Sequence, residues 1–332
     1  MYEQAAIKQN SLLRNGAYGI VMRGVPKCTC AGASLRGRKS APLCCIKLDT
    51  ATDGACGSGG MFVQSMRFVD EHKGNRLNVS IYGQELTDTT RRLAKMNLAI
   101  RGISANLGAE AANTFLNDQH KDLKADFSLE NPPFNQKDWR EANQLTDDPR
   151  WNGYPTPPTS NANYGWLLNT LSKLGQNGVG VVLLANGALS AGTEGNDEYE
   201  IRKRLIENDC VEAIVILPRS MFYTTDISVT AWILNRNKKS RIEKRPSGDV
   251  TFRDRSDEVL FMDLRQMGHP YEKNTLNSQR KTVQSSLTAS NHGASRGIRR
   301  LTRIFRNSAM LPRKPKSSRR TISLSQAGTL SL

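Results

Sequence analysis

The four residues Asn131-Pro132-Pro133-Phe134 carry the most specific chemical pattern in this chain. Two consecutive prolines donate no backbone hydrogen bond and hold the chain in an extended turn. The Asn131 side-chain oxygen and the Pro132 carbonyl are then two fixed acceptors, which suits a planar amino group with two hydrogens. Phe134 adds a flat apolar surface on which a base can stack. We therefore interpret the motif as a binding site for an exocyclic amine rather than as a helix-breaking turn alone.

A second candidate is the glycine-rich stretch DGACGSGG from Asp53 to Gly60, which an apolar helix start follows. A turn of this kind between a strand and a helix lets backbone N–H groups approach a ligand closely. Alone it is a weak signal, because many such strings are only tight turns. Glu85 strengthens it, since nucleotide-type cofactors have their ribose hydroxyls held by an acid at the end of the second strand. A solvated carboxylate at a helix start is the alternative for Glu85.

Strands and helices that could position these motifs alternate between residues 50 and 272, a pattern typical of an α/β sheet. The strand before Asp53 is not evident, because Thr50-Ala51-Thr52 lacks apolar patterning and only 43–48 is strand-like. The expected strands elsewhere are 78–83, 124–129, 179–185, 211–217, 227–235 and 259–264, and the expected helices are 87–102, 165–174 and 197–208.

The net charge of +16 is concentrated at the two ends of the chain. Residues 1–48 hold eight Lys/Arg against one acid, and residues 273–332 hold thirteen Lys/Arg and no acid, which leaves about −4 for residues 49–272. Contact of the middle segment with DNA would therefore need local basic patches rather than a global field. We divide the chain into an irregular basic segment (1–48), one domain (49–272) and a basic tail expected to be disordered (273–332).

Other composition signals exclude several classes of protein. No run of 18 apolar residues and no basic–apolar leader is present, so we expect neither a membrane span nor a secretory signal. Six cysteines in 332 residues do not suggest a disulfide scaffold, and a reducing cytoplasm fits best. The spacings Cys28-x-Cys30 and Cys44-Cys45 suit a zinc tetrahedron poorly, so we predict no metal site. Cys56 is interpreted as a packing residue, and the four histidines form no triad that the sequence supports.

Several strings in the same order resemble the methyltransferase subunit of type I restriction-modification systems, the HsdM family. The resemblance covers residues 53–272 and includes, besides the glycine turn, SIYGQE, RLAKMNLAIRGI, NDQHKDLKADF, NPPFNQKDW, GWLLNTL, GVGVVLLANGALS and ILPRSMFYTTDISVTAWILN. It implies a Rossmann-like S-adenosylmethionine-dependent methyltransferase sheet, mostly parallel, with one antiparallel strand at an edge and flanking helices. It also implies methyl transfer to N6 of adenine in DNA, with a specificity (S) subunit and a restriction (R) subunit as partners.

The resemblance implies a role for each matched position. Residues Asn131, Pro132, Pro133 and Phe134 correspond to the catalytic tetrad for a flipped adenine. The positions that correspond to cofactor-binding residues are Asp53, Gly57, Ser58, Gly59, Gly60, Glu85 and Asn113, with Ser58 to Gly60 against the methionine part and Glu85 at the ribose.

The sequence departs from the family pattern at two positions near the motifs and at both ends. Gly54 stands where the family usually has proline, which loosens the turn. Asn113 stands where an acid usually accepts from the amino group of the cofactor's adenine, and we expect its amide oxygen to accept in its place. Residues 1–52 lack the family's helical domain and its Phe-Tyr-Thr-Pro-like motif, and the basic tail replaces the C-terminal helices. We therefore expect truncation or frameshifts at both ends, which translation of the neighbouring reading frames would test.

Two other functions are compatible with the sequence. Methylation of a glutamine amide in a protein also uses an Asn-Pro-Pro-aromatic turn, although the MNLAIRG and NQKDW strings favour DNA. A non-catalytic remnant that binds partners or nucleic acid through its basic ends belongs to a different class, and salt-sensitive DNA binding that survives loss of 49–272 would support it.

Overall fold

The computed structural model describes residues 50–71, 74–222, 226–243, 249–266, 269–272, 275–277 and 302–306. The segment 1–48, with its four cysteines, lies outside the described residues, as do His72 and His292. Most of 273–332 lies outside them as well. The described parts of that stretch are the strands β11 (Thr275–Asn277) and β12 (Thr302–Arg306).

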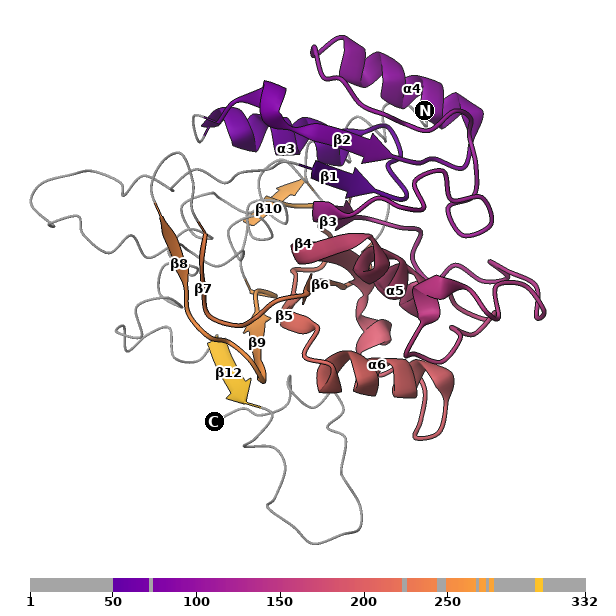
Figure 1. The fold of residues 1–332 in the computed structure, drawn as a ribbon, viewed down its shortest axis with the longest axis vertical. Coiled ribbons are helices and arrows are strands. Elements are labelled where there is room, and N and C mark those ends of the chain that lie inside the picture. Colours follow the sequence, from indigo (N-terminus) through magenta and orange to yellow (C-terminus); the bar gives the residue numbers. More distant parts are fainter. Residues whose placement is uncertain are drawn as a thin grey trace, which may run out of the picture.

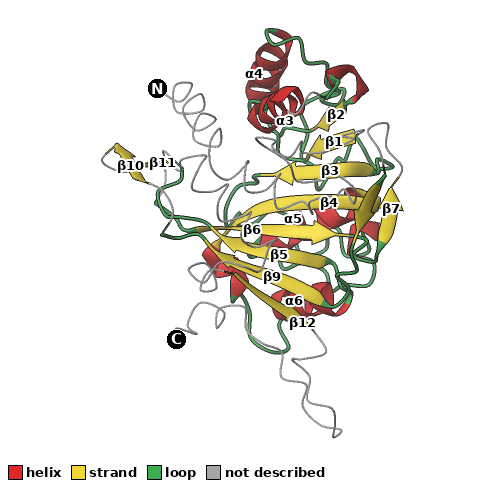
Figure 2. Cartoon of the chain, turned by 90° about the vertical axis from the view of Figure 1, so that its left-hand side faces the viewer, coloured by secondary structure: helices red, strands yellow, loops and turns green. Residues whose placement is uncertain are grey.

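Eight strands form one mixed sheet in the order β12-β9-β5-β6-β4-β3-β1-β2 (Figure 1). Figure 2 shows this sheet face-on, with β2 at one edge and β12 at the other. The neighbours β2, β1, β3 and β4 run parallel, as do β5 and β9. Besides β12, the strands are β1 (Thr50–Asp53), β2 (Ser80–Gly83), β3 (Ala125–Glu130), β4 (Leu174–Ala185), β5 (Val211–Ile216), β6 (Val229–Asn235) and β9 (Glu258–Asp263).

One antiparallel strand was expected, at an edge of the sheet, and the edge strand β12 does pair antiparallel with β9; a second antiparallel strand, β6, was not expected inside the sheet. Strand β6 pairs antiparallel with β4 on one side and with β5 on the other, so it lies inside the sheet. Every residue of β6 is buried, because its apolar side chains have a packed layer on both faces. The mostly parallel Rossmann-like sheet itself is confirmed.

Strand β1 is the second correction, because residues 50–52 were not expected to form a strand. Ala51 pairs with Ile81 of β2 and with Phe127 of β3, so the strand is hydrogen-bonded along both edges. Thr50 and Thr52 are β-branched and suit a pleated backbone. Four residues suffice because hydrogen bonds to β2 and β3 stabilise the strand. A segment this short shows no clear apolar pattern in the sequence.

Three helices match the expected ranges to within a few residues, and a fourth follows the glycine turn, where only a helix start was expected. They are α3 (Gly60–Glu71), α4 (Asp88–Ala99), α5 (Asn163–Lys173) and α6 (Asp197–Glu207). The N-cap of α6 is Asn196, whose side chain accepts from the backbone of Glu198, and acids fill its first turn. Three 3-10 turns accompany them, η1 (Arg76–Asn78), η2 (Pro149–Trp151) and η3 (Asn186–Leu189).

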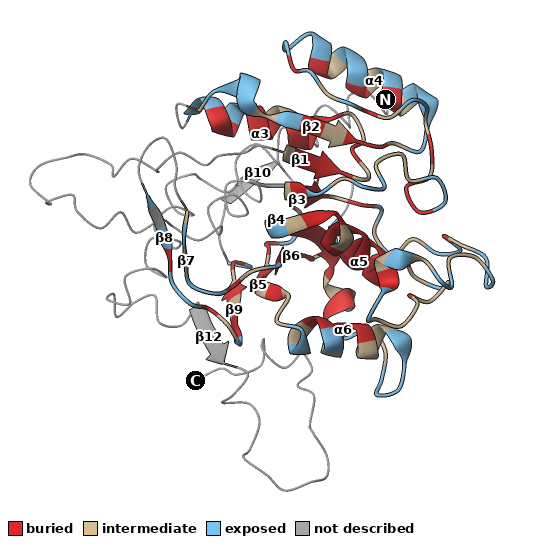
Figure 3. Ribbon diagram, viewed as in Figure 1, coloured by how far each residue is buried: buried red, intermediate tan, exposed pale blue. Residues whose placement is uncertain are grey.

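Buried residues lie along the strands of the sheet, whereas exposed residues lie on the outer surfaces of helices such as α4 and α6 (Figure 3). Helix α3 packs on one face, through residues such as Met61 and Phe68. Helices α5 and α6 cover the other face, where Leu168 and Leu205 meet the buried Trp232 of β6. Helix α4 packs against α3 and β2 in a third cluster.

Two small antiparallel hairpins lie outside the main sheet and were not expected from the sequence. They are β7 (Arg241–Glu243) with β8 (Val250–Phe252), and β10 (His269–Glu272) with β11. None of the helices in the described segments is long and apolar enough to cross a membrane.

Candidate functional site

The glycine turn and the Asn131–Phe134 motif lie at the same edge of the sheet. Strands β1 and β3 are parallel neighbours, with Ala51 beside Phe127 and Thr52 beside Ser128. The chain therefore leaves β1 at Asp53 next to the point where β3 ends and Asn131 begins. Ligands of doubly wound sheets bind at this carboxyl edge.

The glycine turn is built from backbone conformations that favour glycine. Gly57 and Gly59 have φ values of 53° and 74°. The Cys56 N–H donates to the Gln84 carbonyl at 3.0 Å, and the Gly59 N–H donates to the Cys56 carbonyl at 2.8 Å. Gly60 is the first residue of α3, so the turn leads directly into a helix N-terminus, where anionic ligand groups bind favourably.

Helix α4 supports the turn from outside. The Asn97 side chain donates to the Ser58 carbonyl at 2.7 Å. Leu98 of the same helix packs against Gly59, where an added Cβ would lie 3.2 Å from the Leu98 Cγ. The close approach of α4 and the positive φ together favour glycine at position 59.

Glu85 follows β2 and faces the turn. Its Oε2 accepts from the Gly57 N–H at 2.9 Å and its Oε1 accepts from the Thr87 N–H at 3.3 Å. Each carboxylate oxygen can accept further hydrogen bonds, so the group is fixed and still able to bind a diol. The bond to Thr87, at the start of α4, fits a helix-start carboxylate, and the bond to Gly57 fits a carboxylate that supports the glycine turn.

Gln84 is a supporting residue that the sequence analysis did not identify. Its side chain is buried, and its Nε2 donates to the Ala112 carbonyl at 3.2 Å and to the Asn117 carbonyl at 2.7 Å. Its Oε1 accepts from the Gln119 N–H at 3.1 Å. Gln84 therefore ties the loop that contains Asn113 to the end of β2.

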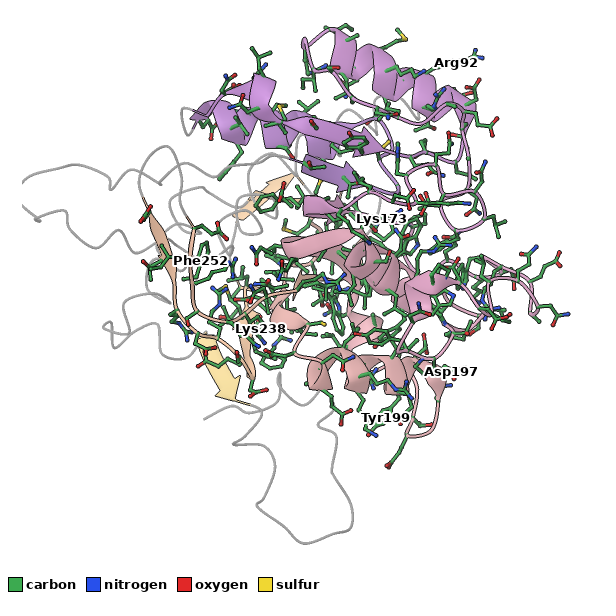
Figure 4. The ribbon with its side chains drawn as sticks, viewed as in Figure 1. Arg92, Lys173, Asp197, Tyr199, Lys238 and Phe252 are labelled. Atoms are coloured by element: carbon green, nitrogen blue, oxygen red, sulfur yellow. The ribbon has the colours of Figure 1, made fainter. Side chains whose placement is uncertain are left out.

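A buried ion pair holds the far end of the same loop. Lys173 lies in the interior on α5 (Figure 4), and its Nζ donates to Asp118 Oδ2 at 2.5 Å and to the His120 carbonyl at 2.6 Å. Both side chains are about nine-tenths buried. Arg92, by contrast, points outward from α4 in the same view.

The Asn113 side chain differs from its expected role in one respect. Its Oδ1 accepts from the Phe115 N–H at 2.8 Å and from the Leu116 N–H at 3.4 Å, so the oxygen caps its own loop. Within the described residues, the Asn113 amide nitrogen has no hydrogen-bond partner. The group that Asn113 offers to a ligand is therefore mainly a donor, not the acceptor that the sequence suggested.

The Asn131–Phe134 motif forms a fixed corner. The Asn131 side chain is half-buried and, among the described residues, has no hydrogen-bond partner. Phe134 contacts Phe222 edge-on, with ring centroids 5.6 Å apart and an interplanar angle of 77°.

The start of α5 anchors the chain directly after this corner. Asn135 has a φ of 53°, and its N–H donates to Asn163 Oδ1 at 3.2 Å. In return, the Asn163 Nδ2 donates to Asn135 Oδ1 at 2.9 Å. These two reciprocal bonds were not apparent from the sequence, and they set the direction in which the chain leaves Phe134.

Two buried carboxyl groups end the adjacent strands. Burial, and secondarily the nearby Glu130, raises the pKa of Asp53 well above its usual value. Burial also raises the pKa of Glu130 to about 7, although the hydroxyls of Thr170 and Ser128 oppose the shift. Burial raises the pKa of the Cys56 thiol too, which fits a packing role for this cysteine. Among the described residues, no cluster of His, Cys, Asp or Glu could hold a metal ion.

The family model described as N-6 DNA Methylase matches residues 45–295 of the chain. The chain is 48% identical over 217 residues to the type I restriction enzyme HindI methylase subunit of Haemophilus influenzae, which covers 65% of this chain and 45% of that relative. It is 40% identical over 199 residues to the MjaIX methylase subunit of Methanocaldococcus jannaschii, covering 58% of this chain and 34% of the relative. The chain thus spans less than half the length of these curated relatives.

A solved structure shows the same fold. The type I restriction-modification system methyltransferase subunit from Streptococcus thermophilus superposes with a TM-score of 0.65 at 26% identity, over 80% of this chain and 52% of that one. A type I restriction enzyme EcoKI M protein has a TM-score of 0.56 at 19% identity, over 79% and 59% of the two chains, which supports the fold alone.

Proposed function

The chain belongs to the N-6 DNA methylase family, and on that premise we propose that it transfers the methyl group of S-adenosylmethionine to N6 of adenine in DNA. The observation that carries the proposal is the position of the Asn131–Phe134 corner beside the glycine turn, at the carboxyl ends of the parallel neighbours β3 and β1. An amine acceptor site and a nucleotide-type cofactor turn are thereby adjacent.

The corner supplies two acceptors for the amino group of a flipped adenine. The Asn131 Oδ1 and the Pro132 carbonyl accept its two hydrogens, which localises the nitrogen lone pair toward the methyl group. Phe134 stacks on the base, which has left the duplex. S-adenosylmethionine supplies an activated methyl group on a sulfonium. No strong base is required for the attack, since positioning and dipoles carry most of the acceleration. The sulfonium would leave as a neutral thioether, and the methylated nitrogen, then cationic, would release one proton to solvent.

The residues around the glycine turn fit this cofactor. The left-handed backbone at Gly57 and Gly59 leaves no side chain between the turn and a ligand. The fixed Glu85 carboxylate suits the two ribose hydroxyls. We assign Asp53, Gly57, Ser58, Gly59, Gly60, Glu85 and Asn113 to the cofactor site and Asn131, Pro132, Pro133 and Phe134 to the catalytic site.

The proposed partners follow from the relatives, which are named as methylase subunits of type I restriction enzymes. We propose that this chain acts as the modification subunit with a specificity subunit, which would select the DNA sequence, and with a restriction subunit. A protein that modifies the cell's own DNA in this way would work in the cytoplasm. The proposed methyltransferase domain is residues 49–272.

Transfer of a labelled methyl group tests the proposal, with the full chain, a specificity subunit and unmethylated DNA. We expect Asn131→Ala to lower the rate at least about 100-fold, the usual cost of losing one group that stabilises a transition state, while cofactor affinity stays unchanged. Asn152→Ala, an exposed asparagine in the following segment, is the matched control and should retain full activity.

The acceptor arms of this experiment distinguish the competing functions. Transfer to a release-factor peptide that contains glutamine, with none to DNA, would favour the protein-glutamine methyltransferase. Cofactor-independent DNA binding without transfer to either acceptor would favour the non-catalytic remnant. An Asn131→Ala variant as active as the wild type would refute the catalytic assignment.

A further inference from the structure

Arg150 links three parts of the molecule that meet at the proposed cofactor site. It lies on η2, in the segment 135–162 that connects the Asn131–Phe134 corner to α5. Its side chain is only 9% exposed, and its partner Asp148 is 12% exposed. A buried guanidinium needs all of its donors satisfied, so its contacts report what it holds in place.

Asp148 fixes the orientation of the guanidinium from within the same segment. Its Oδ1 accepts from the Arg150 Nε at 2.8 Å and its Oδ2 accepts from the Arg150 Nη2 at 2.7 Å. This two-bond geometry is the strong form of an arginine–carboxylate pair. Burial would raise the pKa of Asp148, but the hydrogen bonds from Arg150 hold it below its usual value, so the pair stays charged.

The remaining donors reach the loop that contains Asn113. The Arg150 Nη1 donates to the Thr114 carbonyl at 2.9 Å, and Nη2 donates to the Phe115 carbonyl at 2.6 Å. The guanidinium also lies 5.6 Å from the centre of the Phe115 ring. Two consecutive carbonyls of the loop are therefore held by one rigid fork.

One of these carbonyls belongs to the peptide unit that orients Asn113. The Thr114 carbonyl and the Phe115 N–H are opposite ends of the same planar peptide. Arg150 holds the carbonyl, and the N–H donates to Asn113 Oδ1 at 2.8 Å. Rotation of this peptide would break both bonds, so Arg150 fixes the cap that aims the Asn113 amide.

The same network reaches the glycine turn. The Thr114 hydroxyl donates to the Gly54 carbonyl. Asn169 of α5, whose Oδ1 accepts from the Arg150 Nη1 at 3.3 Å, also lies against Gly54. Arg150 thus connects the Asn113 loop directly to α5, and connects it to the glycine turn through the Thr114 hydroxyl.

We propose that Arg150 is a positioning residue that acts through Asn113, holding this side chain in its ligand-binding arrangement and so coupling the segment after the catalytic corner to cofactor binding. The proposal rests on the proposed function. It assigns to the 135–162 segment a role in cofactor affinity, although none of the proposed cofactor residues lies in that segment.

Calorimetric titration of the full chain with S-adenosylmethionine tests the proposal. Lysine keeps the charge of Arg150 but cannot bridge Asp148 and two carbonyls, so we expect Arg150→Lys to weaken cofactor binding about tenfold, the usual cost of losing a group that orients a ligand contact. Arg140→Lys is the matched control, because Arg140 lies in the same segment and its hydrogen bonds to described residues go to carbonyls of that segment, at Glu141, Ala142, Gln144 and Pro157. The affinity of Arg140→Lys for S-adenosylmethionine should stay within about twofold of wild type.

A double-mutant cycle separates positioning from general support of the fold. If Arg150 acts through Asn113, adding Arg150→Lys to the Asn113→Ala variant should weaken cofactor binding by less than about twofold further. If the two effects are independent, the affinity loss of the double variant should equal the product of the two single losses. Three results would each overturn the proposal. They are affinity losses that multiply in the double variant, equal affinity losses in Arg150→Lys and Arg140→Lys, and an unchanged affinity in Arg150→Lys. If Arg150→Lys does not fold, Asp148→Asn loosens the fork while retaining arginine, and unchanged affinity there would equally overturn it. Absence of binding by the wild type would instead count against the proposed function.

Discussion

The chemistry of Asn113 depends on a single oxygen atom. An aspartate at this position would use one carboxylate oxygen to cap the Phe115 N–H and keep the other for a ligand, but an asparagine has only the oxygen that is already engaged. Its free amide nitrogen can donate to a ring nitrogen of the cofactor's adenine, but it cannot accept from the adenine amino group. The departure from the family pattern therefore weakens a specific contact while preserving the loop.

We predict that Asn113→Asp raises the affinity for S-adenosylmethionine about tenfold, because it restores a charged acceptor worth roughly 1.5 kcal/mol or more. Calorimetric titration measures the change. Asn117→Asp is the matched control, since Asn117 lies in the same loop with an exposed side chain and adds the same charge. An equal gain in both variants would show that charge alone, and not the acceptor at position 113, changes the affinity.

Glu130 predicts a pH dependence of stability. Its pKa in the folded protein is raised by burial to about 7, so the native state retains a proton that the unfolded chain loses near pH 4.5. The stabilisation is full below pH 4.5 and is lost as the pH rises toward 7. We expect Glu130→Gln to remove this part of the pH dependence and to raise the free energy of unfolding at pH 8 by on the order of 3 kcal/mol.

Denaturant unfolding between pH 5 and pH 8 measures the Glu130 effect. Glu194→Gln, at an exposed acid, is the control and should follow the wild type at every pH. Asp53, whose pKa is raised in the same direction, accounts for dependence that remains in Glu130→Gln. A variant that kept the full wild-type slope would contradict a protonated, buried Glu130.

Residue types alone point to the proposed ligand-facing residues but not to the residues that support them. Asn131, the glycines and Glu85 stand out because their chemistry is unusual for a turn. Gln84 and Arg150 do not, because they act by donating to backbone carbonyls 28 and 36 residues away, and any buried polar side chain could do so. Asn113 could be located from the sequence, but the engagement of its oxygen depends on the local turn.

The packing of α4 against the glycine turn gives a prediction about Gly59. Alanine there would meet both a positive φ and the Leu98 side chain at 3.2 Å. We expect Gly59→Ala to lower the free energy of unfolding by about 1–2 kcal/mol and to weaken cofactor binding at least about tenfold, because the turn must move to accept a Cβ.

Gly102, just after α4, separates strain from function. It has a φ of 62°, and an added Cβ would meet nothing within 4 Å. Gly102→Ala should therefore cost a similar amount of stability but leave cofactor affinity unchanged, as measured by denaturant unfolding and calorimetry. Loss of affinity in both variants would mean that global destabilisation, not the turn, controls binding.

The elements that the sequence predicts best are those whose burial is uniform or periodic. Strand β4 was expected from the apolar run at 179–185, which is buried throughout. Strand β1 was missed because a four-residue segment shows little hydrophobic periodicity. Its stability comes from β2 and β3, which are distant in the sequence. The interior position of β6 was missed because strand order follows from the connections between strands, whereas periodicity reports only local structure.

For the whole molecule, the site draws on the ends of β1, β2 and β3, which belong to one continuous sheet with packed layers on both faces. A ligand that bridges three adjacent strands stabilises the whole sheet if the sheet unfolds as one unit. Cofactor at 100 times its dissociation constant should then add about 2.7 kcal/mol to the free energy of unfolding. This increase in the free energy of unfolding should be the same in a variant that is destabilised elsewhere in the core.

Leu184 provides the test, because it is fully buried in β4 within the core shared with α5 and α6 and is not among the proposed ligand contacts. We expect Leu184→Ala to cost about 2–5 kcal/mol, while Leu77→Ala, at a side chain that is 92% exposed, costs almost nothing. In denaturant unfolding, the cofactor should add the same increment to the wild type and to both variants, since distant effects add. If the increment disappears in Leu184→Ala, or if two transitions separate, the half of the sheet that binds the cofactor unfolds independently of the half that contains β5 and β6.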